Sequence, residues 1–488
     1  MSDTVSDGMG SDSADNARVP RRRRQGAGRV IGAAVTINPV PPHVAAKSTR
    51  LATFILILCL PMFGQTFQYL IDLFPFYALS KAWPLLALPL VVYAVSKLPL
   101  PYKPLYALTL IYVIVVTPTL SMFQLGNGFF DAMATTVKTW SFMNYFSLAA
   151  LLFLLKPDVA TLRKTMIGLG IATFIIMIAL WLVEPHDAYV QNQNQSKLLI
   201  YDDRGYHIYM PMFFGMFYVF YLNRRLWLER HWISGVLLVI TCASLIAIYK
   251  ERTALIAGAV AIVYGAAFSL SRAKRIPLIA VGMVGGMIGA FFAIRHLIDQ
   301  LSSSLGASLS VRQETAALIY SYVTDQPLRW VFGVGSITRF STTTLRDLFQ
   351  DKHFFLADVG WLGTLFEYGI IGTVLIILVY VSGIRLARQA AASGDAEKPF
   401  RAALADYAVY LMVVSTIYSA VFTPGEVATI SAIAIYCTGL RRRLLNDETA
   451  PLAEAPLEKE SSVPSPTTGS RQRRRTVLDL QAPADRLA

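Results

Sequence analysis

The chain has 488 residues, of which 55% are hydrophobic and only 15% are charged, and its mean hydropathy is +0.49. Soluble domains carry nearer a quarter charged residues, so this composition excludes an ordinary soluble enzyme. The apolar residues stand in blocks close to the roughly 20 residues that cross a bilayer as a helix, and they do not alternate as barrel strands do. The sequence therefore predicts an all-α polytopic membrane protein.

The formal net charge of +13 does not by itself indicate a nucleic-acid partner, because Lys and Arg also mark the cytosolic loops of membrane proteins. No nucleic acid is expected. The three cysteines, Cys59, Cys242 and Cys437, lie in apolar blocks without the spacing of metal ligands. No metal site and no cofactor is predicted.

Along the chain, residues 1–50 and 441–488 are polar, charged and Pro-rich, and are predicted to be disordered cytoplasmic tails. The membrane domain is expected at 51–440. About twelve spans are expected, near 51–73, 82–98, 104–121, 139–155, 165–183, 207–222, 232–249, 253–270, 276–296, 355–382, 404–422 and 427–440.

The distribution of basic residues predicts the orientation. With the N-terminus placed in the cytoplasm, the internal loops carry more than twice as many Lys and Arg as the short external loops. This is the asymmetry that the positive-inside rule describes, so both termini are expected in the cytoplasm.

Two external segments stand out. Residues 184–206 form a polar loop, and residues 297–352 form a much longer one between the ninth and tenth spans. A connection of that length indicates a folded functional element. Its stretch "VRQETAALIYSYVTDQ" predicts an amphipathic helix with an apolar face. That face comprises Val311, Ala317, Leu318, Tyr320 and Val323.

Basic side chains on the external side are the informative ones, because the positive-inside rule does not account for them. They are Arg204, Lys250, Arg252, Arg312, Arg339 and His353. Guanidinium groups suit a diphosphate, and His353 could serve as a general base near neutral pH. Gly333 and Gly335 would permit a tight turn or close approach of a ligand. The plainer alternative is that each arginine anchors at the interface or pairs with a nearby carboxylate, such as Asp202, Asp203 or Glu251.

The tenth span carries two carboxylates, Asp358 and Glu367. Nine residues of one helix place them on opposite sides, so they cannot form an acid/base couple. Asp358 is expected in the outer site. Glu367 is expected deeper, held by a buried hydrogen bond or protonated.

The order of these motifs resembles the O-antigen ligase and exopolysaccharide polymerase superfamily over about residues 200–385. The resemblance rests on "RG" at Arg204–Gly205, on "YKERTAL", on the long loop with "VRQETAALIYSYVTDQPLRWVFGVGS", and on a His ahead of "LFEYGIIG". It implies a metal-independent, inverting glycosyltransferase of the all-helical, GT-C-like class. Such enzymes use undecaprenyl-diphosphate-linked sugars at the periplasmic face of the inner membrane.

Carried onto this sequence, the resemblance implies that Arg204 and Arg252, with Lys250 beside them, bind the lipid diphosphate. Arg312, Arg339, Gly333 and Gly335 become candidate substrate contacts in the loop. His353 would activate the acceptor hydroxyl. The chain has Phe354–Phe355 where relatives of this kind carry Asn or Ser, which raises Asp358 as an alternative base.

The leading hypothesis is a polysaccharide repeat-unit polymerase, because "LADVGWLG" is more similar to polymerases than to ligases. An O-antigen ligase that transfers glycan to lipid A core or protein is the first alternative. A lipid-linked glycan flippase is the second, although no internal repeat or paired broken helices are evident. Membrane lipids, a flippase and a chain-length regulator are expected partners.

Overall fold

A computed structural model of the chain describes residues 42–68, 70–191, 198–202, 204–270, 273, 275, 277, 306–337, 345–349, 356–393, 397–419 and 424–438. Apart from the first residues of helix α1, these all belong to one compact unit, Ser48–Ala488. The tail 441–488, nearly all of the expected span 276–296, and residues 1–41 lie outside the described residues. Helix α1 begins at Pro42, so the last part of the expected N-terminal tail is helical.

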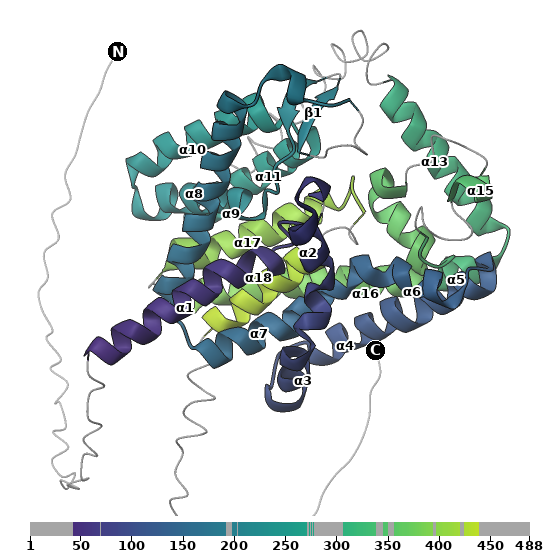
Figure 1. Cartoon of the computed structure of the whole chain (residues 1–488), viewed down its shortest axis with the longest axis horizontal. Helices are drawn as coiled ribbons and strands as arrows, with labels where there is room; N and C mark the ends of the chain where they lie inside the picture. Colours follow the sequence, from purple (N-terminus) through teal and green to yellow (C-terminus); the bar gives the residue numbers. More distant parts are fainter. Residues whose placement is uncertain are drawn as a thin grey trace, which may run out of the picture. The chain divides into compact units, whose positions relative to one another are not determined.

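Helices make up most of the described chain (Figure 1). The first group is α1 (Pro42–Phe63), η1 (Ile71–Leu73), α2 (Phe74–Leu86), α3 (Leu88–Lys97), α4 (Lys103–Ile111), the π-helical η2 (Tyr112–Val116), α5 (Thr117–Leu125), α6 (Phe129–Thr135), η3 (Thr136–Met143), α7 (Asn144–Leu155), α8 (Val159–Val183) and η4 (His186–Ala188). Strands β1 (Leu199–Asp202) and β2 (Gly205–Ile208) follow.

The second group of helices begins after this strand pair. It is α9 (Phe213–Glu229), α10 (Trp232–Ser244), the π-helical η5 (Leu245–Tyr249), α11 (Arg252–Ser269), α13 (Gly306–Thr324), α14 (Pro327–Phe332), α15 (Leu345–Phe349), η6 (Leu356–Val359), α16 (Gly360–Ala392), α17 (Lys398–Val414) and α18 (Pro424–Cys437).

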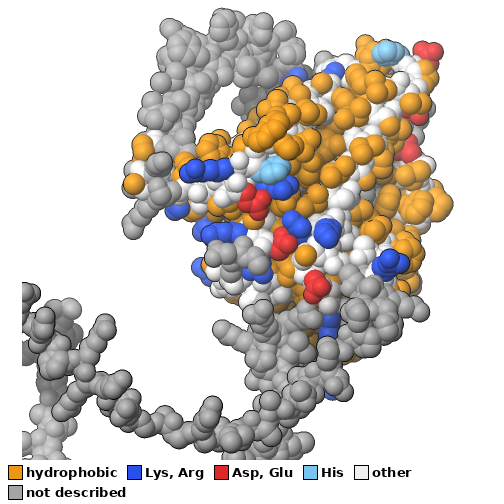
Figure 2. All heavy atoms as spheres, turned by 90° about the vertical axis from the view of Figure 1, so that its left-hand side faces the viewer, with side chains coloured by type: hydrophobic (Ala, Val, Ile, Leu, Met, Phe, Trp, Pro, Cys, Tyr) orange, Lys and Arg blue, Asp and Glu red, His pale blue; other side chains and the backbone are white. Residues whose placement is uncertain are grey.

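Within the described residues, six helical stretches are long and apolar enough to cross a membrane. They are Ile71–Lys97, Lys103–Leu125, Val159–Val183, Trp232–Tyr249, Arg252–Ser269 and Leu356–Ala392. One face of the molecule shows a wide area of hydrophobic side chains, with Lys and Arg gathered mainly in a band beside it (Figure 2). These features agree with the expected all-α membrane bundle, and the count of twelve spans stays a prediction.

Several other expected spans coincide with helices that lie inside the bundle. Helix α17 packs against α9, α11 and α16, and α18 packs against α7 and α16. Almost every side chain of α18 is buried. Figure 1 shows α17 and α18 in the middle of the helices. A helix that is apolar on all sides is expected at such a position, because it has no face to offer to water.

The first expected span, 51–73, is shorter in the structure. Helix α1 ends at Phe63, and Gln65 takes a left-handed conformation with φ of 54°. The buried amide of Gln65 donates to Ser141 Oγ (2.9 Å) and accepts from the backbone N–H of Gly425 (2.8 Å). Helix α1 therefore ends just before Gln65, whose side-chain amide hydrogen-bonds with two other segments of the chain.

A buried ion pair joins α9 to α17. Arg224 donates to both carboxylate oxygens of Asp406, at 2.7 and 2.6 Å, and Asp406 is fully buried. The expected span 207–222 ends before Arg224. Helix α9 in fact continues to Glu229, which brings the arginine inside the bundle opposite its carboxylate.

The amphipathic helix expected in the long loop is present as α13. Of the expected apolar face it buries Val323, whereas Ala317 and Tyr320 are exposed. Ile319 and Val323 are almost fully buried and pack in a cluster with Val334 and Phe366. Tyr320, which was expected on the buried face, is 62% exposed. The buried residues Thr315, Ile319 and Val323 are four positions apart, so they lie on one side of the helix.

The expected tenth span is not one continuous helix. Asp358 lies in the 3₁₀ turn η6, and α16 begins only at Gly360, which has φ of 55°. A second break occurs inside α16 at Gly369, with φ of 62° and ψ of −172°. The inference that Asp358 and Glu367 share one helix is therefore wrong, because glycines interrupt it on both sides of Glu367.

The break at Gly369 is filled by backbone from the "GVGS" segment. The N–H groups of Val334 and Gly335 donate to the carbonyls of Phe366 and Glu367, at 2.8 and 3.1 Å. Tyr112 Oη donates to the carbonyls of Phe332 and Tyr368. Carbonyls freed by the break are thus satisfied within the protein, as non-helical backbone inside a membrane bundle requires.

Glu367 is buried beside this break and pairs with Lys138 of η3. Lys138 Nζ lies 2.6 and 2.8 Å from the two carboxylate oxygens. The expectation that Glu367 holds helices together through a buried hydrogen bond is confirmed. Its partner was not foreseen, since Lys138 was assigned to an external loop.

Candidate functional site

A short β-hairpin positions Arg204. Strands β1 and β2 pair antiparallel, with Asp202 opposite Gly205, so Arg204 lies in the tight turn between them. The backbone N–H of Arg204 donates to Asp202 Oδ1 (2.9 Å), and Gly205 has φ of 75°. The expected polar loop 184–206 thus contains a hairpin, whose turn fixes the position of this arginine.

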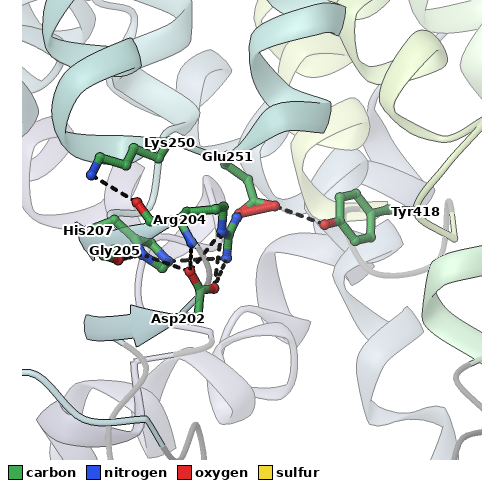
Figure 3. Close-up of polar contacts among 7 residues, drawn as sticks. All are labelled: Asp202, Arg204, Gly205, His207, Lys250, Glu251 and Tyr418. Atoms are coloured by element: carbon green, nitrogen blue, oxygen red, sulfur yellow. Dashed lines mark hydrogen bonds and ion pairs between the residues drawn. The ribbon is translucent and has the colours of Figure 1, made fainter. Parts of the chain in front are cut away.

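The Arg204 guanidinium is held by two carboxylates (Figure 3). Nη2 lies 2.6 Å from Asp202 Oδ2, and Nη1 lies 2.6 Å from Glu251 Oε2. Nη2 also lies 3.2 Å from Nε2 of the buried His207, whose Nδ1 is 3.0 Å from the Gly205 carbonyl. The pairing that was the plainer alternative for Arg204 is thus present, with Asp202 and Glu251 as partners.

These contacts shift the ionisation of the hairpin residues. Burial alone raises the pKa of the Asp202 carboxyl, but the hydrogen bonds and charge of Arg204 outweigh it and leave that pKa below its ordinary value. Burial acts to lower the pKa of Arg204, and Asp202 and Glu251 together raise it above its ordinary value. Both groups are therefore held in their charged forms at neutral pH.

The segment Lys250–Glu251–Arg252, which we call the KER junction, connects η5 to α11, and its three side chains have different surroundings. Lys250 ends η5 in a left-handed conformation with φ of 53°, and α11 begins at Arg252. Lys250 Nζ donates to the Arg204 carbonyl (3.0 Å) and lies 5.8 Å from the centre of the Trp181 ring. Glu251 is buried and also accepts from Tyr418 Oη (2.9 Å).

Arg252 has a different environment from Arg204. Its side chain is exposed, and it makes no hydrogen bond or ion pair that involves the part of the chain described here. Of the two arginines assigned to the diphosphate, Arg252 is therefore the one whose guanidinium is uncommitted.

Asp358 lies in the same region. Its carboxyl is within electrostatic range of both Glu251 and Arg312, which comes from α13. Residues from the hairpin, the KER junction, α13 and η6 therefore meet at one place, although they are widely separated in the sequence.

Gly333 and Gly335 serve the packing of backbone against backbone. A Cβ at Gly333 would overlap the backbone of Glu367 and Gly369, and one at Gly335 would overlap Ser121. The close approach predicted for these glycines is present, and the group that approaches is the chain itself. Their contact with a substrate stays a prediction.

Two predicted site residues, His353 and Arg339, lie outside the described residues. The structure adds two residues that the sequence analysis did not select, His207 and Tyr418. The sequence did indicate a role for Glu251. It stands between two basic residues where a helix begins, and a carboxylate buried at such a place needs a basic partner.

The chain matches no protein-family model and no curated protein.

Proposed function

We propose that the chain is a bacterial inner-membrane glycosyltransferase that polymerises polysaccharide repeat units carried on undecaprenyl diphosphate. The observation that supports this most is the convergence of Arg204, Lys250 and Glu251 with Asp358, close to the exposed Arg252. A cationic group with a nearby carboxylate suits a reaction in which a diphosphate leaves and a hydroxyl loses its proton.

In the proposed reaction, a hydroxyl of a lipid-linked repeat unit attacks the anomeric carbon of the growing chain. The new carbon–oxygen bond forms as the bond from that carbon to the diphosphate breaks. The hydroxyl proton passes to Asp358 or His353, and the departing diphosphate keeps the electron pair. Arg252, with Lys250 two residues before it, stabilises the negative charge that develops on the leaving group.

Arg204 contributes to this site differently from Arg252. Because Asp202 and Glu251 neutralise its charge, it adds little net attraction for an anion. Its side chain binds Glu251 and its carbonyl binds Lys250, so Arg204 holds the hairpin against the KER junction. We therefore assign direct diphosphate contact to Arg252 and a positioning role to Arg204.

The Arg252→Ala variant tests the proposal in producing cells. It should lose high-molecular-weight polymer and accumulate single repeat units on the lipid carrier. Arg225→Ala is the matched control, because Arg225 is also a surface arginine and, among the described residues, pairs with Glu229 on its own helix. Normal polymer in the Arg252→Ala strain would contradict the assigned role.

Deletion of the gene separates the alternatives. A polymerase mutant retains only single units on the lipid, whereas a ligase mutant still makes long polymer on the carrier. A flippase mutant would retain its repeat units on the cytoplasmic side. The break in α16 does not favour transport, because its carbonyls are bonded to the chain's own backbone.

A further inference from the structure

A group of tyrosines and carboxylates adjoins the Arg204 site, and we call it the tyrosine lobe. It comprises Tyr209, Tyr249, Tyr410, Tyr418, Glu251 and Glu426. Tyr209 is within electrostatic range of Glu251, Glu426, Arg204 and Asp358, and its ring lies 6.0 Å from that of Tyr249. Tyr410 is within range of Glu426, Tyr209, Glu251 and Tyr418. The lobe therefore continues the same site toward α17 and α18.

Two hydroxyls in the lobe are available to a ligand. Tyr249 and Tyr410 are only 6% and 7% exposed, yet neither side chain makes a hydrogen bond with any part of the described chain. Both hydroxyls therefore keep hydrogen-bonding capacity that no described residue uses.

Glu426 is the carboxylate of the lobe without a basic partner. Glu251 is paired with Arg204. Glu426 accepts a hydrogen bond from Tyr407 Oη (2.6 Å) and forms no ion pair with the described residues. One of its oxygens thus has capacity for a further donor.

We infer that the tyrosine lobe is a subsite for an uncharged monosaccharide unit of the lipid-linked substrate. Sugar hydroxyls both donate and accept, so they match carboxylate oxygens and tyrosine hydroxyls, while aromatic rings match the apolar faces of a sugar. The lobe offers no uncommitted cation among the described residues to neutralise a sugar carboxylate, so a sugar acid such as a uronic acid is disfavoured there. This inference rests on the proposed function, because it assigns the sugar next to the diphosphate.

The experiment uses the full-length protein in lipid nanodiscs with two kinds of probe. The first is undecaprenyl diphosphate with and without an attached N-acetylglucosamine. The second is a set of free sugars, namely the methyl glycosides of glucose, galactose and glucuronic acid, observed by saturation-transfer NMR. The variants are Tyr410→Phe, which removes one hydroxyl, and Glu426→Gln, which replaces one carboxyl oxygen by an amide nitrogen.

Both variants should weaken binding of the sugar-bearing lipid by about three- to tenfold, the effect of one lost hydrogen bond. Binding of the sugar-free lipid should not change. Among the free sugars, a neutral glycoside should receive saturation that both variants reduce, and the glucuronide should receive less. Tyr436→Phe is the control, since its hydroxyl donates to the Pro157 carbonyl near the other end of α18.

If a variant weakens the binding of both lipids equally, its side chain has a structural role and the inference is overturned. Unchanged binding of both lipids would also overturn it. Saturation transfer to the glucuronide equal to that of the neutral sugars would overturn the assignment to an uncharged sugar. If the wild-type protein binds neither lipid but transfers saturation to a neutral glycoside through Tyr410 and Glu426, the lobe stands and the proposed polymerase function fails.

Discussion

At the residue scale, Arg204 and Arg252 have the same chemistry and opposite environments. Arg204 is fixed between Asp202 and Glu251, and Arg252 is exposed and uncommitted. Both had been assigned to the diphosphate from the sequence, because a single sequence shows that carboxylates are nearby but not which arginine they reach. The structure therefore separates a positioning arginine from one that can meet an anion.

Alanine substitutions should distinguish these two roles by stability. Arg204→Ala leaves two partly buried carboxylates without their donor and should lower the free energy of unfolding by about 1–3 kcal/mol. Arg252→Ala removes no internal contact and should change it by less than about 0.5 kcal/mol. Melting of the two variants in detergent is the measurement. Equal destabilisation would mean that Arg252 has a partner in the folded chain.

The tyrosines and Glu426 show where sequence reasoning stops at this scale. A tyrosine within an apolar block is usually a core residue, and Tyr407 indeed is buried among other rings. Tyr249 and Tyr410 are buried as well, but their hydroxyls make no hydrogen bond with the described residues. Whether a tyrosine hydroxyl finds a partner depends on which helices pack around it, and the residues next to it in the sequence do not show this.

At the element scale, hydropathy predicted most helices because each block had to exclude polar groups from a bilayer. It did not predict the break at Gly369, since a lone glycine in an apolar run is also common inside an intact helix. The hairpin was missed for a related reason. Its strands are only four residues long and polar in part, so neither strand has a recognisable alternation.

Gly369→Ala tests the broken helix. The residue has φ of 62° and ψ of −172°, and an added Cβ would overlap the backbone of Phe332 and Gly333. Strain and overpacking together should cost at least about 2 kcal/mol of stability. Gly168→Ala is the control, because nothing lies within 4 Å of its Cβ position in helix α8, and it should be neutral or slightly stabilising. Similar melting of both variants would argue against the break.

The Lys138–Glu367 pair, which joins η3 to α16, gives a second test at this scale. Lys138→Met leaves a buried carboxylate without its cation and should destabilise the protein by about 3–5 kcal/mol. Adding Glu367→Gln should recover much of that loss, because the buried charge is then absent. Melting of the single and double variants is compared. A double variant less stable than Lys138→Met would contradict the pairing.

At the scale of the whole molecule, composition was sufficient to predict a helical membrane protein. The number of spans was less accessible, because α7 and α18 are as apolar as a span and yet are largely enclosed by other helices. The candidate site was predicted in part. The basic residues Arg204, Lys250, Arg252 and Arg312 were selected because they stand on the expected external side. Asp358 was selected because it lies at the outer end of an expected span. Their grouping depends on the fold.

The proposed orientation can be tested with single cysteines in a background of Cys59→Ala, Cys242→Ala and Cys437→Ala. Asp187→Cys lies ahead of the hairpin and Ala392→Cys at the end of α16, and both positions are exposed. With the site on the periplasmic side, a membrane-impermeant maleimide should label the Asp187→Cys variant in intact spheroplasts. It should label the Ala392→Cys variant only after lysis. The reverse pattern would place the site in the cytoplasm.

Chain elongation by the purified protein tests the central claim most directly. Full-length protein in nanodiscs is supplied with lipid-linked repeat units from a strain that lacks this gene, and the products are separated by gel electrophoresis. The account predicts a ladder of lengthening glycans on the lipid for the wild type and for Arg225→Ala, and single units only for Arg252→Ala. The account would be contradicted if folded wild-type protein left only single units. It would also be contradicted if Arg252→Ala made the ladder as well as the wild type.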